Sequence, residues 1–284
     1  MRLERTKNRK KNKIRYAVIV ICLAVFAYSA WHLGGNYWRA YKSQRAAEEQ
    51  QKKIEQQLEE ERKRREEEEK RAAEEDSKNQ EDNTDGQGEE NAEPEPFVLD
   101  FTELTSLNSD IMGWLVVDGT NINYPVLFSN DDRDFYLTHN YLGEYDPQGA
   151  VYIENFNHKD MSDFDTIVYG HSMLNGNMFG TLHSFSNWDF FQNYGTVTFY
   201  TPSATYHYQV FETATIGDKH ILTYLDNGST ESINSYLELI SGYGNAFIKP
   251  GYNVTADNRI LTLSTCTTDD TQRLVVFAVL VDVS

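Results

Sequence analysis

The fold is decided by the stretch Ile260-Leu-Thr-Leu-Ser-Thr-Cys266, a polar loop over 267–272, and the stretch Arg273-Leu-Val-Val-Phe-Ala-Val-Leu-Val281. Both stretches are rich in β-branched and apolar residues, and two such runs joined by a short polar loop are typical of paired antiparallel strands. If the strands pair as a hairpin, Cys266 ends one and Arg273 opens the other. The pattern therefore predicts that these two side chains lie at the same rim of a sheet.

The pattern continues outward from this hairpin. Further short runs with period-two or β-branched character predict six more strands, at 113–117, 123–128, 150–154, 166–169, 196–200 and 205–211. Helices are expected at 101–107 with Asp100 as N-cap, at 178–191, and at 230–240 with Ser229 or Thr230 as cap. Eight strands with few helices predict a mostly β protein, an eight-stranded closed or nearly closed barrel with short peripheral helices.

The N-terminal part of the 284-residue chain has a different composition. Residues 1–15 carry eight Lys or Arg and one acid, whereas 16–34 carry no charged side chain. This apolar length, with Trp31 near its end, predicts a transmembrane anchor whose basic head, 1–15, stays in the cytoplasm. The expected localisation is thus the cell membrane, crossed once, with the remaining chain on the extracytoplasmic side. A cleaved signal peptide is the alternative, but no clear cleavage site follows the apolar run.

Between the anchor and the barrel, charged residues dominate. Residues 35–76 consist mostly of good helix formers without a sustained heptad pattern, which favours a solvated helical stalk over a coiled coil. Residues 77–96 are acidic and nearly free of apolar side chains, which predicts a disordered linker. The predicted domain, 97–284, has six basic and 23 acidic residues within a net charge of −18 for the whole chain. That balance argues against nucleic acid as a partner.

Cys266 is the only cysteine of the predicted domain, since the other one, Cys22, lies in the apolar segment. A single thiol in an exported domain is a reactive nucleophile, an intermolecular disulfide partner or a small buried side chain. A cation near a cysteine favours the thiolate, and the guanidinium of Arg273 can also stabilise an oxyanion. The alternative is that Arg273 is a surface residue that forms an ion pair with Asp269 or Asp270. The sequence predicts neither a metal site nor a cofactor, because zinc-ligand spacings and glycine-rich phosphate loops are missing from it.

A histidine that could exchange protons with this thiol stands at another strand end. His171 follows the predicted strand 166–169 and Gly170, and it precedes a loop that enters a helix. An imidazole at such an exit is well placed to act as a general acid or base near neutral pH. The remaining histidines of the domain lie in loops, a helix or a strand, and none of them directly follows the glycine that ends a predicted strand.

Together, Thr262-Leu-Ser-Thr-Cys266, Tyr169-Gly-His171 and an arginine opening the next strand resemble the signature of sortases. These are membrane-anchored cysteine transpeptidases of Gram-positive cell surfaces. The run Tyr169-Gly-His-Ser-Met-Leu-Asn-Gly-Asn-Met-Phe-Gly-Thr-Leu182 and a long insert over about 217–253 are most similar to class B members. The resemblance covers about 97–284 and departs from class B at Thr267, where these enzymes often carry an acid.

The resemblance implies a function and a set of site residues. Cys266 would form a thioester with a C-terminal sorting signal of a surface protein, His171 would exchange the protons, and Arg273 would stabilise the oxyanion. The acceptor would be an amine of a peptidoglycan precursor or a pilin lysine. Substrate contacts are expected from Ser264, Thr265, His220 and Ile221. The alternatives are a surface cysteine protease that uses water as acceptor and a non-enzymatic anchored surface protein.

Overall fold

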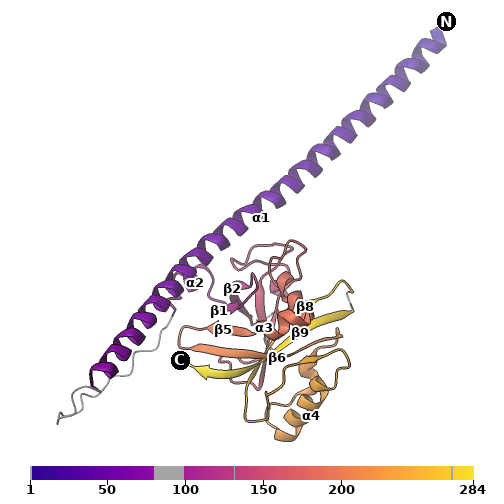
Figure 1. Ribbon diagram of the computed structural model, residues 1–284. Helices are drawn as coiled ribbons and strands as arrows, with labels where there is room; N and C mark the ends of the chain where they lie inside the picture. The colour runs from indigo at the N-terminus through magenta and orange to yellow at the C-terminus, as the bar shows by residue number, and fades with distance from the viewer. Residues whose placement is uncertain (1, 80–98, 131, 270) are drawn as a thin grey trace. The chain divides into compact units, whose positions relative to one another are not determined.

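The structure is a computed structural model that describes residues 2–79, 99–130, 132–269 and 271–284. Contacts divide the chain into two compact units, Met1–Glu49 and Gln50–Ser284. The first unit is purely helical where it is described, and the second contains the sheet (Figure 1).

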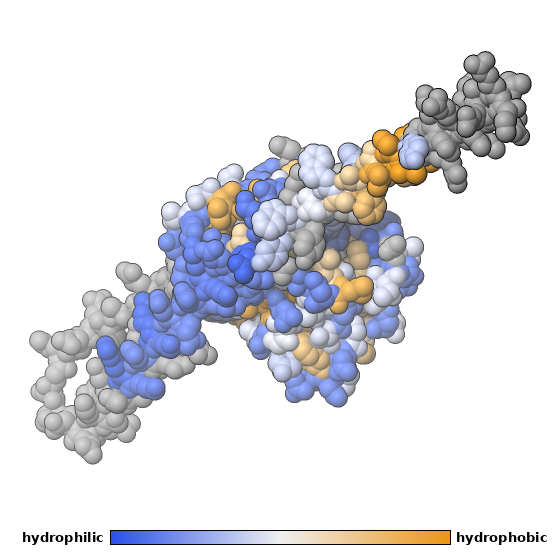
Figure 2. All heavy atoms as spheres, turned by 90° about the horizontal axis from the view of Figure 1, so that it is seen from above, coloured by the Kyte–Doolittle hydropathy of each residue, from blue (hydrophilic) through white to orange (hydrophobic). Residues whose placement is uncertain are grey.

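Helix α1 (Arg2–Asn79) is continuous through the predicted head, apolar segment and stalk. The described apolar side chains between Tyr16 and Trp31 are exposed, and they form the orange stretch of the helix in Figure 2. Among the described residues, no helix has the length and apolar character that a membrane crossing requires. The transmembrane part of the predicted fold is therefore not supported. Most of the predicted linker 77–96 lies outside the described residues.

The part of α1 that belongs to the second unit is not fully solvated, in contrast to the expectation for the stalk. Ile54 is only 2% exposed. Around it, Lys53 Nζ lies 2.6 Å from Glu103 Oε1, and Asn123 Nδ2 donates to Glu55 Oε1 over 3.0 Å. One buried apolar side chain and a few polar contacts thus join this stretch to Glu103, before the sheet, and to Asn123, in a strand of the sheet.

The sheet closes into the predicted eight-stranded barrel. Its strands are β1 (Ile111–Val117), β2 (Asn123–Ser129), β3 (Val151–Glu154), β4 (Asp165–Tyr169), β5 (Thr196–Tyr200), β6 (Thr205–Gly217), β7 (Phe247–Ile248), β8 (Ile260–Cys266) and β9 (Gln272–Val283). Their order is β5-β1-β2-β3-β4-β8-β9-β6-β7, and an additional β5–β6 pairing closes the barrel. The two-residue strand β7, which the sequence did not predict, pairs with β6 beyond the residues of β6 that pair with β5.

Strand directions bring the predicted site residues to one end of the barrel. Strand β4 runs parallel to β8, with Tyr169 opposite Ser264. Strand β8 runs antiparallel to β9, with Cys266 opposite Arg273. Because parallel strands end at the same edge of a sheet, the residues that follow β4 emerge beside the end of β8.

The helices lie around the barrel, as Figure 1 shows. They are α2 (Thr102–Leu107), the 3₁₀ helices η1 (Phe135–Leu137), η2 (Gly180–Ser186) and η3 (Ile221–Tyr224), and the α-helices α3 (Trp188–Asn193) and α4 (Thr230–Ser241). Alternate residues of β8 serve two hydrophobic clusters: Leu261 and Leu263 belong to one with η2 and α3, and Ile260 belongs to another with α4. The alternation follows from the period of two along a strand.

Two helix predictions need correction. The expected helix 178–191 is two pieces, because Asn187 has an extended backbone and its side chain accepts from Phe190 N to cap α3. Asp100 is not the N-cap residue of α2. Phe101 holds that position, while Asp100 Oδ1 accepts a hydrogen bond from Thr102 N. The predicted Ser229 cap of α4 is confirmed, since its side chain accepts from Ser232 N.

Candidate active site

A cleft of about 220 Å³ opens at the end of the barrel where β4 and β8 finish. Its walls come from η1, the ends of β3, β4, β6, β8 and β9, and the start of the insert after β6. The cleft contains every site residue that the sequence predicted, namely His171, His220, Ile221, Ser264, Thr265, Cys266 and Arg273.

The thiol and the guanidinium stand on neighbouring strands. Cys266 is partly exposed, is free of a disulfide and ends β8, and Arg273 is its directly paired partner on β9. Arg273 Nη1 donates to the carbonyl of Gln272 over 3.0 Å. The alternative partner Asp269 uses its Oδ1 to accept from the Thr271 hydroxyl, whereas Asp270 lies outside the described residues. Cys266 and Arg273 therefore stand at the same end of the barrel, on paired strands.

His171 enters the cleft from the loop that follows β4. Gly170 precedes it, and an added Cβ there would lie 2.7 Å from the ring of Phe179, so glycine allows this close approach. His171 Nε2 lies 2.8 Å from the carbonyl oxygen of Leu137. A carbonyl only accepts, so Nε2 carries a proton, and Nδ1 of the neutral ring is left with the lone pair. The imidazole can therefore take up a second proton at Nδ1.

The four predicted substrate residues occupy different positions on the wall. Ser264 and Thr265 are buried on β8, and the Thr265 hydroxyl donates to the Gly170 carbonyl over 2.7 Å. That bond ties the end of β8 to the end of β4. His220 and Ile221 come from the insert, where His220 directly precedes η3. The structure thus brings all four to the cleft, with Thr265 also serving as a tie between strands.

A polar cluster that the sequence did not predict lies on the wall of the cleft. His220 Nε2 lies 2.9 Å from Glu154 Oε2 and 3.0 Å from the Tyr169 hydroxyl. Burial raises the pKa of Tyr169, with the Glu154 charge adding to the effect. Tyr169 therefore stays a neutral hydroxyl at physiological pH. The cluster joins strands β3 and β4 to the insert.

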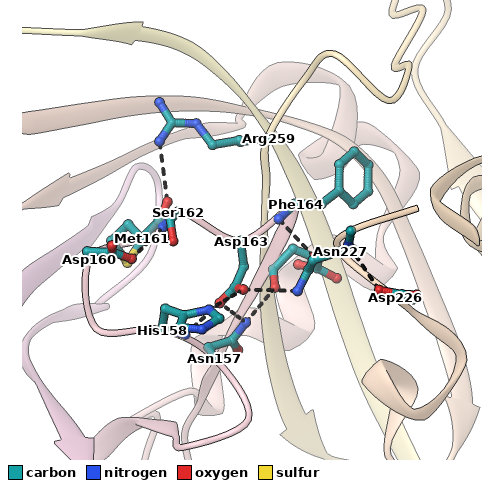
Figure 3. Close-up of polar contacts among 12 residues, drawn as sticks. Asn157, His158, Asp160, Met161, Ser162, Asp163, Phe164, Asp226, Asn227 and Arg259 are labelled. Atoms are coloured by element: carbon teal, nitrogen blue, oxygen red, sulfur yellow. Dashed lines mark hydrogen bonds and ion pairs between the residues drawn. The ribbon is translucent and has the colours of Figure 1, made fainter. Parts of the chain in front are cut away.

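The insert is also held at the beginning of β4, at the end of the strand away from the cleft, by the contacts drawn in Figure 3. Asp163, which is 4% exposed, accepts from Asn157 Nδ2 over 3.0 Å, from His158 N over 2.6 Å and from Asn227 Nδ2 over 2.9 Å. Asn227 Oδ1 in turn accepts from Phe164 N over 3.0 Å. One carboxylate thus joins the β3–β4 loop to the loop before α4. This cluster of Asn157, His158, Asp163 and Asn227 is called the Asp163 clamp below.

A second buried carboxylate supports the same attachment. Asp165, at the start of β4, accepts from the Tyr236 hydroxyl of α4 over 2.5 Å and from the Thr262 hydroxyl of β8 over 2.8 Å. Burial raises the pKa of Asp165 to about 7. The two carboxylates fix the insert, and with it His220 and Ile221, against the barrel.

His183 is a further residue that the sequence did not single out. It lies on η2, and its Nε2 is 3.1 Å from the carbonyl oxygen of Cys266 and 3.1 Å from Ser172 Oγ. No local motif marks this histidine, because its partner is 83 residues away in sequence. Within the part of the chain that the structure describes, no group of three or more His, Cys, Asp or Glu side chains could hold a metal ion.

A closed eight-stranded barrel with a cysteine, a histidine and an arginine in one terminal cleft has the parts of a thiol enzyme, the class to which the cysteine transpeptidases of the sortase family belong. The sortase domain family matches residues 115–281, and the chain belongs to the sortase family.

The relatives and solved structures agree on the subgroup. Sortase B of Listeria monocytogenes is 30% identical over 170 residues, which cover 60% of this chain and 68% of that protein. Sortase B of Staphylococcus aureus is 31% identical over 189 residues, covering 65% and 75%. The crystal structure of Clostridium perfringens sortase B superposes with a TM-score of 0.58 at 32% identity, covering 63% of this chain and 98% of that one. The Staphylococcus aureus sortase B–substrate complex gives 0.65 at 25% identity, covering 86% and 99%. The chain is thus a sortase similar to class B members.

Proposed function

We propose that this sortase cleaves a C-terminal sorting signal of surface proteins through a thioester at Cys266 and transfers the acyl product to an amine. The observation that carries the proposal is the shared cleft. Cys266 and Arg273 are paired across β8 and β9, and His171 follows the parallel strand β4 into the same cavity. A nucleophile, a proton carrier and a fixed cation in one cleft are the parts that acyl transfer needs.

The proposed reaction proceeds through two tetrahedral intermediates. The Cys266 thiolate attacks the carbonyl carbon of the scissile peptide, and the oxygen that gains charge is stabilised by N–H groups of Arg273. The carbon–nitrogen bond breaks as His171 gives a proton to the departing amine, leaving the thioester. An incoming amine then attacks the thioester carbon and gives a proton back to His171. The carbon–sulfur bond breaks, and the thiolate is restored.

The proposed acceptor is an amine of a peptidoglycan precursor or a pilin lysine. A thioester can react with amines or with water, so the competing function is a surface protease. The cleft has both acidic and basic groups in its wall, including Asp134, Glu154, Asp218 and Lys219. These side chains can form hydrogen bonds and ion pairs with polar and charged residues of a bound peptide substrate. The recognised motif is best found with an unbiased peptide set.

The test is cleavage of a peptide library by the full chain, with and without hydroxylamine as a small amine. Wild type should release products, and hydroxylamine should convert the acyl part into a hydroxamate that mass spectrometry detects. Cys266→Ala should abolish both products, whereas Arg273→Lys should fold but lose about 10²-fold in kcat because its donors are placed differently. Hydrolysis alone at saturating hydroxylamine would favour the protease, and activity retained by Cys266→Ala would refute the proposal.

We further propose that the chain is a single-pass membrane protein with the barrel on the extracytoplasmic side. The uncharged segment 16–34, the basic residues before it and the exposed apolar side chains on α1 support this proposal. The test is partition of the full chain and of a variant lacking 16–34 between membranes and buffer after alkaline washing. Release of the full chain into the wash would refute the anchor.

A further inference from the structure

The carbonyl group of Cys266 lies where its strand has lost its neighbour. The last main-chain contact between β4 and β8 is the bond from Gly170 N to the Ser264 carbonyl, 3.2 Å long. Carbonyls on one side of a strand recur at every second residue, so the carbonyl of Cys266 points to the same side as that of Ser264. There the chain after Gly170 has turned away, toward His171 and its loop. The nucleophile's own carbonyl therefore needs a donor from elsewhere.

His183 supplies that donor. Its Nε2 lies 3.1 Å from the Cys266 carbonyl oxygen and 3.1 Å from Ser172 Oγ. A carbonyl oxygen only accepts, so Nε2 carries the proton and the Ser172 oxygen shares the same N–H. One imidazole thus contacts both the residue that holds the thiol and the residue directly after His171.

Buried neighbours and main-chain hydrogen bonds hold the backbone of His183 in place. Its neighbours on η2, Leu182 and Phe185, are completely buried in the hydrophobic cluster. The loop before η2 is closed by a bond from Phe179 N to the His171 carbonyl, 2.9 Å long, and by a bridge between Ser172 and Met178. The imidazole therefore extends from a well-packed backbone segment, and its hydrogen bond to the Cys266 carbonyl restrains the end of β8.

We propose that His183 is a positioning residue that holds the end of β8, and with it the Cys266 thiol, in register with His171. It acts through the Cys266 carbonyl and the Ser172 hydroxyl and does not touch the substrate. The inference rests on the proposed function, in which Cys266 and His171 must meet the same peptide carbonyl. A misplacement of reacting groups by about 1 Å can lower a rate by roughly 10²-fold, so one such restraint has a large effect on kcat.

The test compares four variants of the full chain. Gln places an amide N–H near the position of the imidazole Nε2, Asn is one bond too short, and Leu has no donor. His183→Leu and His183→Asn should lower kcat for peptide cleavage about 10- to 100-fold with KM within about threefold, and His183→Gln should restore most of the loss. His207→Leu is the matched control, because His207 contacts Ser284 through Nε2 on β6, at the end opposite Gly217. It should leave kcat unchanged.

Hydrogen exchange measures the restraint without any substrate. Amides of 264–267 should exchange about fivefold faster in His183→Leu and His183→Asn than in wild type or His183→Gln, the effect of losing one hydrogen bond. Unchanged exchange and kcat in His183→Leu would overturn the proposal, and so would a His183→Gln variant as impaired as His183→Leu. If wild type cleaves no peptide, the proposed function fails while the exchange result still decides the role of His183.

Discussion

Replacing Asp163 by alanine tests whether the Asp163 clamp holds the substrate-binding insert in place. The change removes the partner of His158 N, of the His158 ring nitrogen Nδ1 and of Asn227 Nδ2, while Asn157 Nδ2 keeps its second partner, the carbonyl of Asp165, at 2.6 Å. A hydrogen bond to a charged group contributes about 1.5–3 kcal/mol, and a nearly buried carboxylate loses two such bonds from a main-chain and an amide donor. The third contact, to the ring of His158, is mostly exposed and contributes little. We expect the free energy of unfolding to fall by roughly 3–5 kcal/mol.

The assay is urea unfolding followed by tryptophan fluorescence, with thermal melting alongside. For a domain of this size the loss corresponds to a fall in Tm of about 6–20 °C. Because the insert carries His220 and Ile221, KM for peptide cleavage should also rise, about three- to tenfold, at temperatures where the variant is folded. Asp160→Ala is the matched control, since this exposed acid of the same loop bonds only locally, to Ser162. A loss of stability no greater than that of Asp160→Ala would refute the role given to the clamp.

Two further predictions concern stability and the attachment of α1. Burial raises the pKa of Glu212 from 4.5 to about 7, so the folded chain binds more protons than the unfolded chain between these values, and stability falls as pH rises through this window. Glu212→Gln should therefore match wild type near pH 4 and be more stable by up to about 3 kcal/mol at pH 8, and equal stability in urea unfolding at both pH values would contradict this. Ile54→Ala should speed amide exchange over 50–64 by at least about tenfold, since it removes the buried apolar contact of that stretch, whereas the exposed Lys63→Ala should not. Equal exchange in the two variants would show that Ile54 does not attach the helix.

Much of the fold could be predicted because strand patterns are local. The eight barrel strands were found from period-two runs, and the helix 230–240 was found from its Ser229 cap. The break at Asn187 was missed because an asparagine inside an apolar pattern reads equally well as helix interior, until its side chain is seen capping α3. Strand β7 has two residues, which is too short for a pattern of any period.

The contacts of the site also fall into those that local sequence predicts and those that it does not. The hairpin pairing of Cys266 with Arg273 follows from a loop of six residues, so local sequence is enough to place these side chains together. The Glu154–His220–Tyr169 cluster joins residues that are 66 and 51 positions apart, and no local motif marks either contact. Such contacts depend on where the insert folds back onto the barrel.

By itself, the sequence determined that the chain has a lone thiol at a strand end, a cation at the start of the next strand and a histidine after a third. Each of these follows from side-chain periodicity and turn chemistry over about ten residues. Only the tertiary structure decided that the three share one cleft, because β4 pairs in parallel with β8 across about 95 residues of chain. It also decided that His183 contacts the carbonyl of Cys266. Where β4 ends, the carbonyl of Cys266 loses its strand neighbour, and the loop after β4 leads into η2, whose His183 reaches this carbonyl.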